Sequence, residues 1–318
     1  MYEIRHAGAK GFGVFATRSI PRGTRILAER PAFTVRSESE VFAATRRLGE
    51  TERRNLMQLS VSPVRQSSVL SWAEAIWHGG REVLADVLRS AQGDEKPANA
   101  VSAWGSLMEY PGVLSVFRNN NFDIGNGVQA FFKDICRLNH ACAPNAQGNF
   151  NTALGRFTIH AVRPIDAKEE ITLSYLAEHG ALRDARQSRL LDRYGFLCDC
   201  PGCDTAGKRS QEGEERRRRM QVRLQTYAEE AAERETPDPE AELKVMRGLI
   251  EMYEAEGIAG REVATMCLSA AELASKMGRR DEVRRLCEIG LRLDEEAVGA
   301  DGPMFEESVV RVKAMGMS

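Results

Sequence analysis

Two short polar clusters of this sequence have the residue types that chemistry needs. The first is Arg137–Asn145, which reads RLNHACAPN, and the second is Glu170–Tyr175, which reads EITLSY. An amide beside an imidazole, with a phenol farther along, offers the donors and acceptors that hold and orient a bound molecule. Taken singly, His140 fits a core histidine and Tyr175 fits a packed strand residue. Together they favour a ligand site.

A third cluster, CDCPGC, brings three thiols close together in sequence: Cys198, Cys200 and Cys203. Thiolates are zinc ligands, and a structural zinc ion takes four ligands in a tetrahedron. Cys142 is the natural candidate for the fourth, and the alternative is three free thiols without a metal. Because four thiolates leave no open position, we expect one structural zinc ion that ties CDCPGC to the Asn139–His140 region. The remaining cysteines are interpreted as core thiols: Cys136, beside Leu138 on a predicted strand, Cys267 and Cys287.

The elements that must position these clusters are strands. Residues 1–36 show strand and turn patterns, with a glycine loop at Lys10–Gly13 that leads into an apolar strand. Residues 119–176 are strand-like again, with a hairpin turn at Leu154–Gly155. Between them, residues 38–118 favour a helical insertion, on the spacing of Trp72–Trp77, Val83–Leu84 and Val87–Leu88, with a polar break at Gln92–Pro97.

The last third of the chain is expected to be helical. A helix is predicted over Arg183–Tyr194, with Leu190 and Leu191 facing inward, and a polar linker over Asp204–Gly213. From about residue 214, apolar residues at helical spacing predict two antiparallel helix hairpins, one of which turns at Gly278–Asp281. This tail loosely resembles a tetratricopeptide array, although no repeat of about 34 residues is visible.

The bulk numbers exclude some classes of protein. The 318 residues allow one large or two ordinary domains, and the net charge of −2 gives no overall nucleic-acid footprint. No apolar run approaches the ~18 residues of a membrane helix, and the start has no apolar signal segment. We therefore expect no membrane partner, no nucleic-acid substrate, a monomer by default, and a place in the nucleus or cytoplasm, where thiols stay reduced.

Together, the clusters resemble those of the SET-domain protein lysine methyltransferases, over most of residues 3–203. The resemblance implies an α+β fold in which the β-rich SET domain has small, pseudoknotted sheets. It implies these parts: 1–37, the first SET part; 38–118, the helical insertion; 119–182, the second SET part; 183–204, the post-SET zinc segment; and 214–318, the helical tail.

The resemblance also implies a cosubstrate, S-adenosylmethionine, and assigns residues to it. The glycine loop that approaches the donor matches Lys10, Gly11, Phe12 and Gly13, and the family's Asn-His pair, which holds the donor, matches Asn139 and His140. Tyr175 matches the active-site tyrosine, both catalytic and donor-binding. Tyr194 and Phe196 match the aromatic segment that packs on the adenine and walls the lysine channel. Asn121 matches the Asn-Phe segment that closes the insertion in the SET-and-MYND group.

Two departures from the family pattern bear on the substrate. No cysteine lies between Met1 and Cys136, so the zinc module that SET-and-MYND proteins carry in their insertion is absent, and the chain looks closer to fungal-type SET proteins. No cysteine-rich segment precedes the domain either. The implied substrate is therefore a protein lysine, histone or non-histone. The alternatives are a catalytically weak SET-fold module that recruits protein partners through the helical tail, and a zinc-stabilised scaffold without a donor site.

One charge run has two interpretations. Arg216–Arg219 fits a nuclear-import or nucleic-acid contact, or else a solvated helix face. Glu214 and Glu215 stand four residues before Arg218 and Arg219, the spacing of helical ion pairs. We therefore favour the solvated helix.

Overall fold

The computed structural model describes residues 1–59, 61, 73, 76–81, 83–85, 88 and 100–317. These residues form two compact units. The first contains Met1–Ala28, Leu138–Leu190 and Leu197–Ser318, and the second contains Glu29–Arg137 and Leu191–Phe196. Sequence predictions for Trp72, Glu74, Ala75, Val87 and Gln92–Pro97 fall outside the described residues.

The sheet that carries the polar clusters lies in the first unit and has the strand order β1-β2-β10-β7. Its strands are β1 (Tyr2–His6), β2 (Phe12–Ala16), β10 (Glu170–Leu173) and β7 (Asn139–His140). β10 pairs antiparallel with β2 and parallel with β7, so that Thr172 lies opposite Asn139 and Leu173 opposite His140. Since Val14, Ile171 and Leu173 are buried, the register is fixed, and the Asn-His pair lies beside the strand that ends just before Tyr175.

A second small sheet of this unit has the order β3-β9-β8. Its strands are β3 (Arg25–Glu29), β9 (Arg156–Ala161) and β8 (Ala146–Asn151). β8 and β9 form the hairpin expected from the sequence, and they pair along their whole length from Ala146 opposite Ala161. Gly155, in the turn, has a φ of 60°, which a residue with a side chain rarely adopts.

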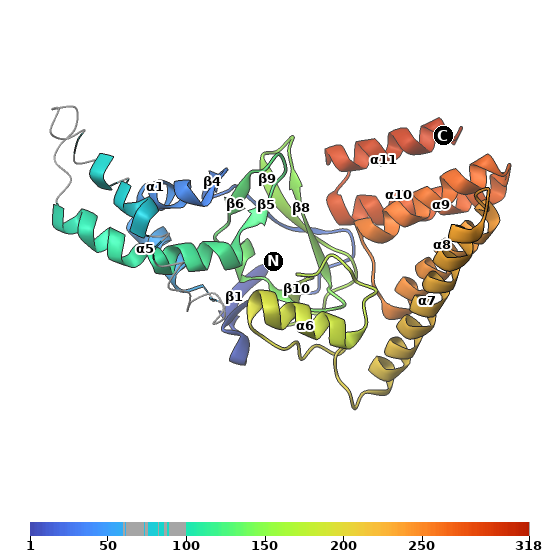
Figure 1. Cartoon of the computed structure of the whole chain (residues 1–318), viewed down its shortest axis with the longest axis horizontal. Coiled ribbons are helices and arrows are strands. Elements are labelled where there is room, and N and C mark those ends of the chain that lie inside the picture. The colour runs from blue at the N-terminus through green and yellow to red at the C-terminus, as the bar shows by residue number, and fades with distance from the viewer. Residues whose placement is uncertain are drawn as a thin grey trace. The chain divides into compact units, whose positions relative to one another are not determined.

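The first unit also contains helices: α6 (Arg183–Tyr194), whose residues from Leu191 on belong to the second unit, α7 (Lys208–Glu233), α8 (Pro239–Glu256), α9 (Arg261–Lys276), α10 (Arg280–Val298) and α11 (Pro303–Ala314). In Figure 1, α7 runs beside α8 and α9 beside α10. Leu243, Leu268 and Leu286 share one apolar core between these helices. α7 begins at Lys208, inside the predicted linker. Leu190 is buried as predicted, but Leu191 is 44% exposed, because consecutive residues on a helix point about 100° apart.

The helical tail is bonded to the β8–β9 sheet. The Gln147 side chain accepts a hydrogen bond from the backbone N–H of Arg261 at 2.8 Å, and the Asn149 amide donates to the Ala297 carbonyl at 3.1 Å. Arg25 on β3 forms an ion pair with Asp301, which lies between α10 and α11. Tail and sheet thus fold as parts of one unit.

The second unit combines a three-stranded sheet with helices. Its sheet has the order β4 (Phe33–Val35), β6 (Gln129–Phe131), β5 (Phe122–Asp123). Its helices are η2 (Glu38–Glu40), α1 (Val41–Arg46), α2 (Glu50–Met57), α5 (Ala100–Asn120) and η3 (Ile135–Arg137). Phe33 stacks on Phe131 with ring centroids 5.3 Å apart, which anchors the sheet in the core. Cys136 lies in η3, not on a strand as predicted, and its thiol donates to the Asn120 carbonyl.

None of the helices in the described part of the chain is long and apolar enough to cross a bilayer.

Asn145 is a buried polar link between the two sheets of the first unit. Its amide nitrogen donates to Glu169 Oε1 at 3.0 Å and to the Glu170 carbonyl at 2.8 Å, and its Oδ1 accepts from the Thr172 N–H at 2.8 Å. The side chain is almost fully buried. Truncation would leave these groups without partners in a site that water reaches poorly.

We expect Asn145→Ala to lower the free energy of unfolding by about 2–4 kcal/mol, measured by urea denaturation. Asn149→Ala is the matched control, because it removes a single amide bond to Ala297 and should cost about 1 kcal/mol. Equal losses in the two variants would contradict the role assigned to Asn145.

Candidate functional site

The glycine loop meets the Asn-His pair at Gly13. The loop, Lys10–Gly13, starts at the end of the 3-10 helix η1 (Gly8–Lys10) and includes Gly11, whose φ of 78° suits glycine. A Cβ on Gly13 would lie 2.7 Å from Glu170 Oε1 and 2.9 Å from Asn139 Nδ2, closer than real side chains allow. The Asn139 amide donates to the Phe12 carbonyl at 3.1 Å and to Glu170 Oε1 at 2.7 Å. Glycine at this position therefore lets the loop, Asn139 and Glu170 converge.

Lys10 is held in the same group by two carboxylates. Its Nζ lies 3.5 Å from Glu170 Oε2 and 3.4 Å from Asp199 Oδ1. Burial lowers the pKa of Lys10, but the charges of Glu170 and Asp199 outweigh burial and leave the pKa above its usual value. The lysine is therefore charged at neutral pH, and it links the glycine loop to the cysteine-rich segment.

The sequence analysis gave Glu170 no role of its own, although it begins the EITLSY cluster. The structure makes it the common partner of Lys10 and Asn139. The signal that would have revealed it is the pairing of β10 with both β2 and β7, because Glu170 is the first residue of β10. A strand register cannot be read from the two motifs separately.

His140 links the tyrosine to the thiols. Its ring is buried, Nδ1 accepts a hydrogen bond from the Tyr175 N–H at 3.0 Å, and Nε2 lies 3.4 Å from Cys142 Sγ. Burial lowers the pKa of His140 to about 4, so the imidazole is neutral at pH 7. Since Nδ1 is an acceptor, the single ring proton lies on Nε2, which faces the sulfur.

Tyr175 follows β10 and is half-buried. Its hydroxyl donates to the Leu138 carbonyl at 2.7 Å, and its ring centroid lies 5.4 Å from that of His140. With its proton engaged at Leu138, the phenol oxygen keeps lone pairs that can accept a hydrogen bond from another group. The geometry therefore presents Tyr175 as an oriented acceptor.

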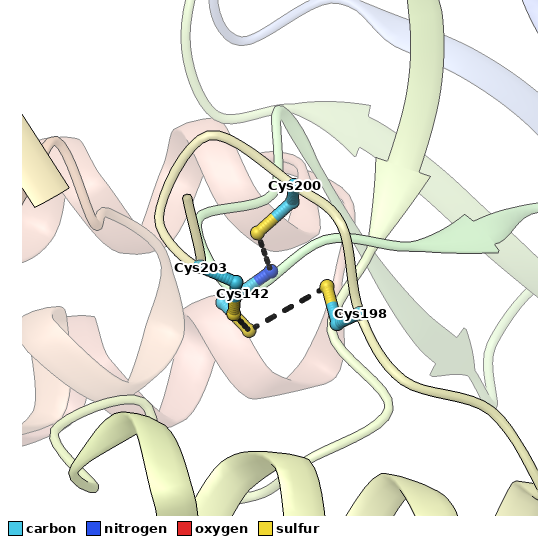
Figure 2. A group of neighbouring side chains, drawn as sticks. All are labelled: Cys142, Cys198, Cys200 and Cys203. Atoms are coloured by element: carbon cyan, nitrogen blue, oxygen red, sulfur yellow. Dashed lines mark hydrogen bonds between the residues drawn. The ribbon is translucent and has the colours of Figure 1, made fainter. Parts of the chain in front are cut away.

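The four predicted metal ligands lie together and are buried. Figure 2 shows Cys142 facing Cys198, Cys200 and Cys203, and all four sulfurs lie within 4.8 Å of one another. Cys142 Sγ is 3.5 Å from Cys203 Sγ and 3.9 Å from Cys198 Sγ. A tetrahedral zinc with Zn–S bonds of about 2.3 Å requires sulfur separations of about 3.8 Å. The donor set is therefore compatible with one zinc ion.

Helix α6 holds the cysteine segment in place. The Gln187 side chain donates to the Cys198 carbonyl at 2.8 Å and accepts from the Cys198 N–H at 2.7 Å. The Cys142 N–H points at Cys200 Sγ, 3.4 Å away, as expected for a thiolate that accepts backbone hydrogen bonds. The segment is thus anchored on the helix that precedes it and on Cys142, two residues after His140.

Three predicted donor-binding residues belong to the second unit. The Asn121 amide donates to the Phe117 carbonyl at 2.9 Å and closes the end of α5. The rings of Tyr194 and Phe196 have centroids 6.4 Å apart. The first unit contains the others: Lys10, Gly11, Phe12, Gly13, Asn139, His140 and Tyr175, together with the four cysteines.

The run Arg216–Arg219 on α7 contains both solvent-exposed and buried arginines. Arg219 pairs with Glu215, four residues before it, at 3.0 Å, as predicted for a solvated helix face, and Arg218 pairs with the same Glu215, three residues before it, at 2.6 Å. For Arg217 that interpretation is wrong, because only 2% of its side chain is exposed and it pairs with Glu256. The run therefore has one residue that faces the interior.

Comparison with known proteins gives one family. The family model described as "SET domain" matches residues 11–176, just over half of the chain. "Histone-lysine N-methyltransferase set5" of Schizosaccharomyces pombe is 26% identical over 82% of this chain and 67% of its own length. "Histone-lysine N-methyltransferase SET5" of Meyerozyma guilliermondii is 28% identical over 58% of this chain and 36% of its own. "N-lysine methyltransferase SMYD2-A" of Xenopus laevis is 38% identical over 25% of this chain and 18% of its own.

The chain therefore spans about two thirds of the first relative, about a third of the second and under a fifth of the third.

Proposed function

We propose, from the premise that this chain belongs to the SET-domain family, that it is a protein lysine N-methyltransferase that uses S-adenosylmethionine. One observation carries the proposal: within a single unit the glycine loop and Asn139 meet at Glu170, and His140, next to Asn139, accepts a hydrogen bond from Tyr175 beside four clustered thiols. The relatives named as histone-lysine or N-lysine methyltransferases support the same reaction class.

The residues that would hold the donor are polar and already oriented. Asn139 is fixed by Phe12 and Glu170, and the absence of a side chain on Gly13 lets Asn139 and Glu170 lie against the glycine loop. Donor binding by Asn121, Tyr194 and Phe196 is proposed on the resemblance to the family alone. When bound, S-adenosylmethionine supplies an electrophilic methyl group on a cationic sulfonium.

The chain's task is then to deliver a neutral lysine amine in line with that methyl group. Free lysine has a pKa of about 10.4, and an apolar channel favours the neutral amine by desolvation. The Tyr175 oxygen, whose proton is engaged at Leu138, would accept a hydrogen bond from the amine and orient it. Such positioning supplies up to about 7–11 kcal/mol of the barrier.

The finer assignments are also proposals. Relatives named for histone lysine and for protein lysine both support a protein substrate, with a histone as one candidate. All seven cysteines are free thiols, which supports a reducing compartment, the nucleus or the cytoplasm. We propose a monomer that does not take nucleic acid as its substrate, in keeping with the net charge of −2.

Calorimetric titration of the zinc-loaded chain with S-adenosylmethionine tests the donor site. We expect micromolar binding that Asn139→Ala weakens at least about tenfold, since the amide that joins Phe12 and Glu170 is lost. Asn149→Ala, on β8, removes an amide of the same kind away from the site and should bind like the wild type. If the folded wild type does not bind S-adenosylmethionine, the methyltransferase proposal is wrong, and a partner-binding module is favoured.

A further inference from the structure

A groove in the helical tail has no part in the donor site or in the cysteine cluster. Its volume is about 850 Å³, and it is lined by α10, by the end of α11 and by the turn between α9 and α10. α11 runs beside α10 in Figure 1. All of the lining residues belong to the first unit, so the groove is formed by one compact body.

The inside of the groove is apolar. Val283 on α10 and Val312 on α11 line it and are buried. Leu291, Met315 and Met317 line it as well, but they are only partly buried, packed on the apolar core of the tail. Methionine side chains are flexible and polarisable, so they adapt to the shape of a bound group. The groove thus offers an apolar surface to the side chains of a partner.

Two exposed arginines of α10 stand at this groove. Arg280 and Arg284 line it one helical turn apart, and among the described residues neither has a carboxylate within 4.0 Å. Their neighbour Arg279 differs, because it pairs with Glu240 and Glu282. Like charges four residues apart weaken a helix slightly, so the stability of α10 does not explain the two arginines.

The unpaired charge of the lining is positive at one end of the groove. The carboxylate that lines it, Glu288, lies one turn beyond Arg284 on α10 and is farther than 4.0 Å from that guanidinium. Two arginines without an ion pair therefore stand against one carboxylate, and both precede it along the helix. Acidic groups of a partner complement the Arg280 end.

The shape of the groove favours a peptide over other anionic partners. Its apolar residues line a concave surface, which the side chains of a peptide enter and a flat bilayer does not. None of the lining residues that the structure describes is aromatic, so the groove lacks the stacking surface that single-stranded nucleic acids use. From Arg280 to Leu291, α10 rises about 17 Å, the length of about three turns of a bound helix.

We propose that this groove binds an acidic amphipathic helix of a partner protein. The apolar side chains of that helix enter between α10 and α11, and its flanking carboxylates pair with Arg280 and Arg284. None of the residues proposed for methyl transfer lines the groove, so this docking function does not depend on the methyltransferase assignment.

Peptide selection against the full chain tests the proposal. The library holds helical peptides of about 12 residues, with leucines fixed on one face and flanking positions that vary among Asp, Glu, Lys and Ser. We expect the selected peptides to be rich in Asp and Glu and to bind with micromolar affinity, measured by fluorescence anisotropy. Their binding should weaken as added salt screens the exposed ion pairs.

Charge reversal places the selected peptide on the protein. Arg280→Glu combined with Arg284→Glu should weaken its binding at least about tenfold. Arg285→Glu combined with Arg292→Glu is the matched control, because these exposed arginines of α10 do not line the groove and the change in net charge is the same. The control should bind within about threefold of the wild type. Thermal unfolding shows whether both double variants are folded.

A change on the peptide guards against a misfolded variant. A peptide with Lys in place of each Glu should bind the wild type at least about tenfold more weakly, and it should bind the folded Arg280→Glu, Arg284→Glu variant better than the wild type. Selection without enrichment of acidic residues would overturn the proposal, as would equal affinities of the two double variants for the acidic peptide. Dimerisation, or binding to phosphatidylserine vesicles, that is lost in the Arg280→Glu, Arg284→Glu variant while no acidic peptide binds would assign the groove to a second copy or to a membrane instead.

Discussion

Tyr175→Phe is expected to lower the rate constant for methyl transfer about 100- to 1,000-fold while the affinity for S-adenosylmethionine stays within about threefold. The variant keeps the ring against His140 and removes only the hydroxyl, whose proton is engaged at Leu138. Losing that one hydrogen bond costs about 1 kcal/mol of stability. Single-turnover transfer from labelled donor to a protein that the wild type methylates measures the effect.

Tyr253→Phe is the matched control for this prediction. It also removes a tyrosine hydroxyl that is hydrogen-bonded, here to Glu262 at 3.3 Å, but on helix α8 of the tail. Its transfer rate should equal that of the wild type. If Tyr175→Phe transferred methyl groups as fast as Tyr253→Phe, the phenol would have no part in orienting the amine, and Tyr175 would be a packing residue.

The second large effect is expected from Cys142→Ser, which should reduce bound zinc from about one ion per chain to none and destabilise the first unit by several kcal/mol. Structural zinc supplies about 10–16 kcal/mol of apparent binding energy in small zinc domains, so losing one of four thiolates is severe. Cys142 also contacts His140, so the loss should reach Tyr175 through the Nδ1 bond. Elemental mass spectrometry and thermal unfolding measure the two effects.

Cys287→Ser controls for the loss of a buried thiol, since Cys287 lies in the core between the tail helices, apart from the ligand set. It should retain zinc and lose only the about 1–3 kcal/mol that a newly buried hydroxyl costs. Retention of one zinc ion by Cys142→Ser would show that the ion needs only the three cysteines of CDCPGC, and the fourth ligand would have to be sought elsewhere.

The sequence predicted the parts of this site whose spacing is local. The three thiols of CDCPGC predicted a zinc site that needs a fourth ligand, and the sulfur of Cys142 lies with the other three. The glycine loop, the Asn-His pair and Tyr175 were grouped by resemblance, and the structure places them in one unit, although their roles stay predictions.

Features that depend on tertiary pairing escaped the sequence. The role of Glu170 required the register of β10 against two strands from distant parts of the chain. The burial of Arg217 was hidden in a run of four arginines with helical ion-pair spacing, because its partner, Glu256, is 39 residues away in sequence. Similarly, the polar residues from Lys208 resembled a linker, yet most are good helix formers.

The bonds between the helical tail and β8–β9 bear on how this protein can be divided or recombined. The family model ends at residue 176, but the compact unit that contains the matched strands continues through α11. A fragment that ended at residue 176 would expose Val162 and leave the side chains of Gln147 and Asn149 without their partners in the helical tail. It would also lack the three cysteines whose sulfurs lie beside Cys142. A fragment that folds alone, whether made by gene recombination or in the laboratory, must therefore be longer than the stretch that the family model matches.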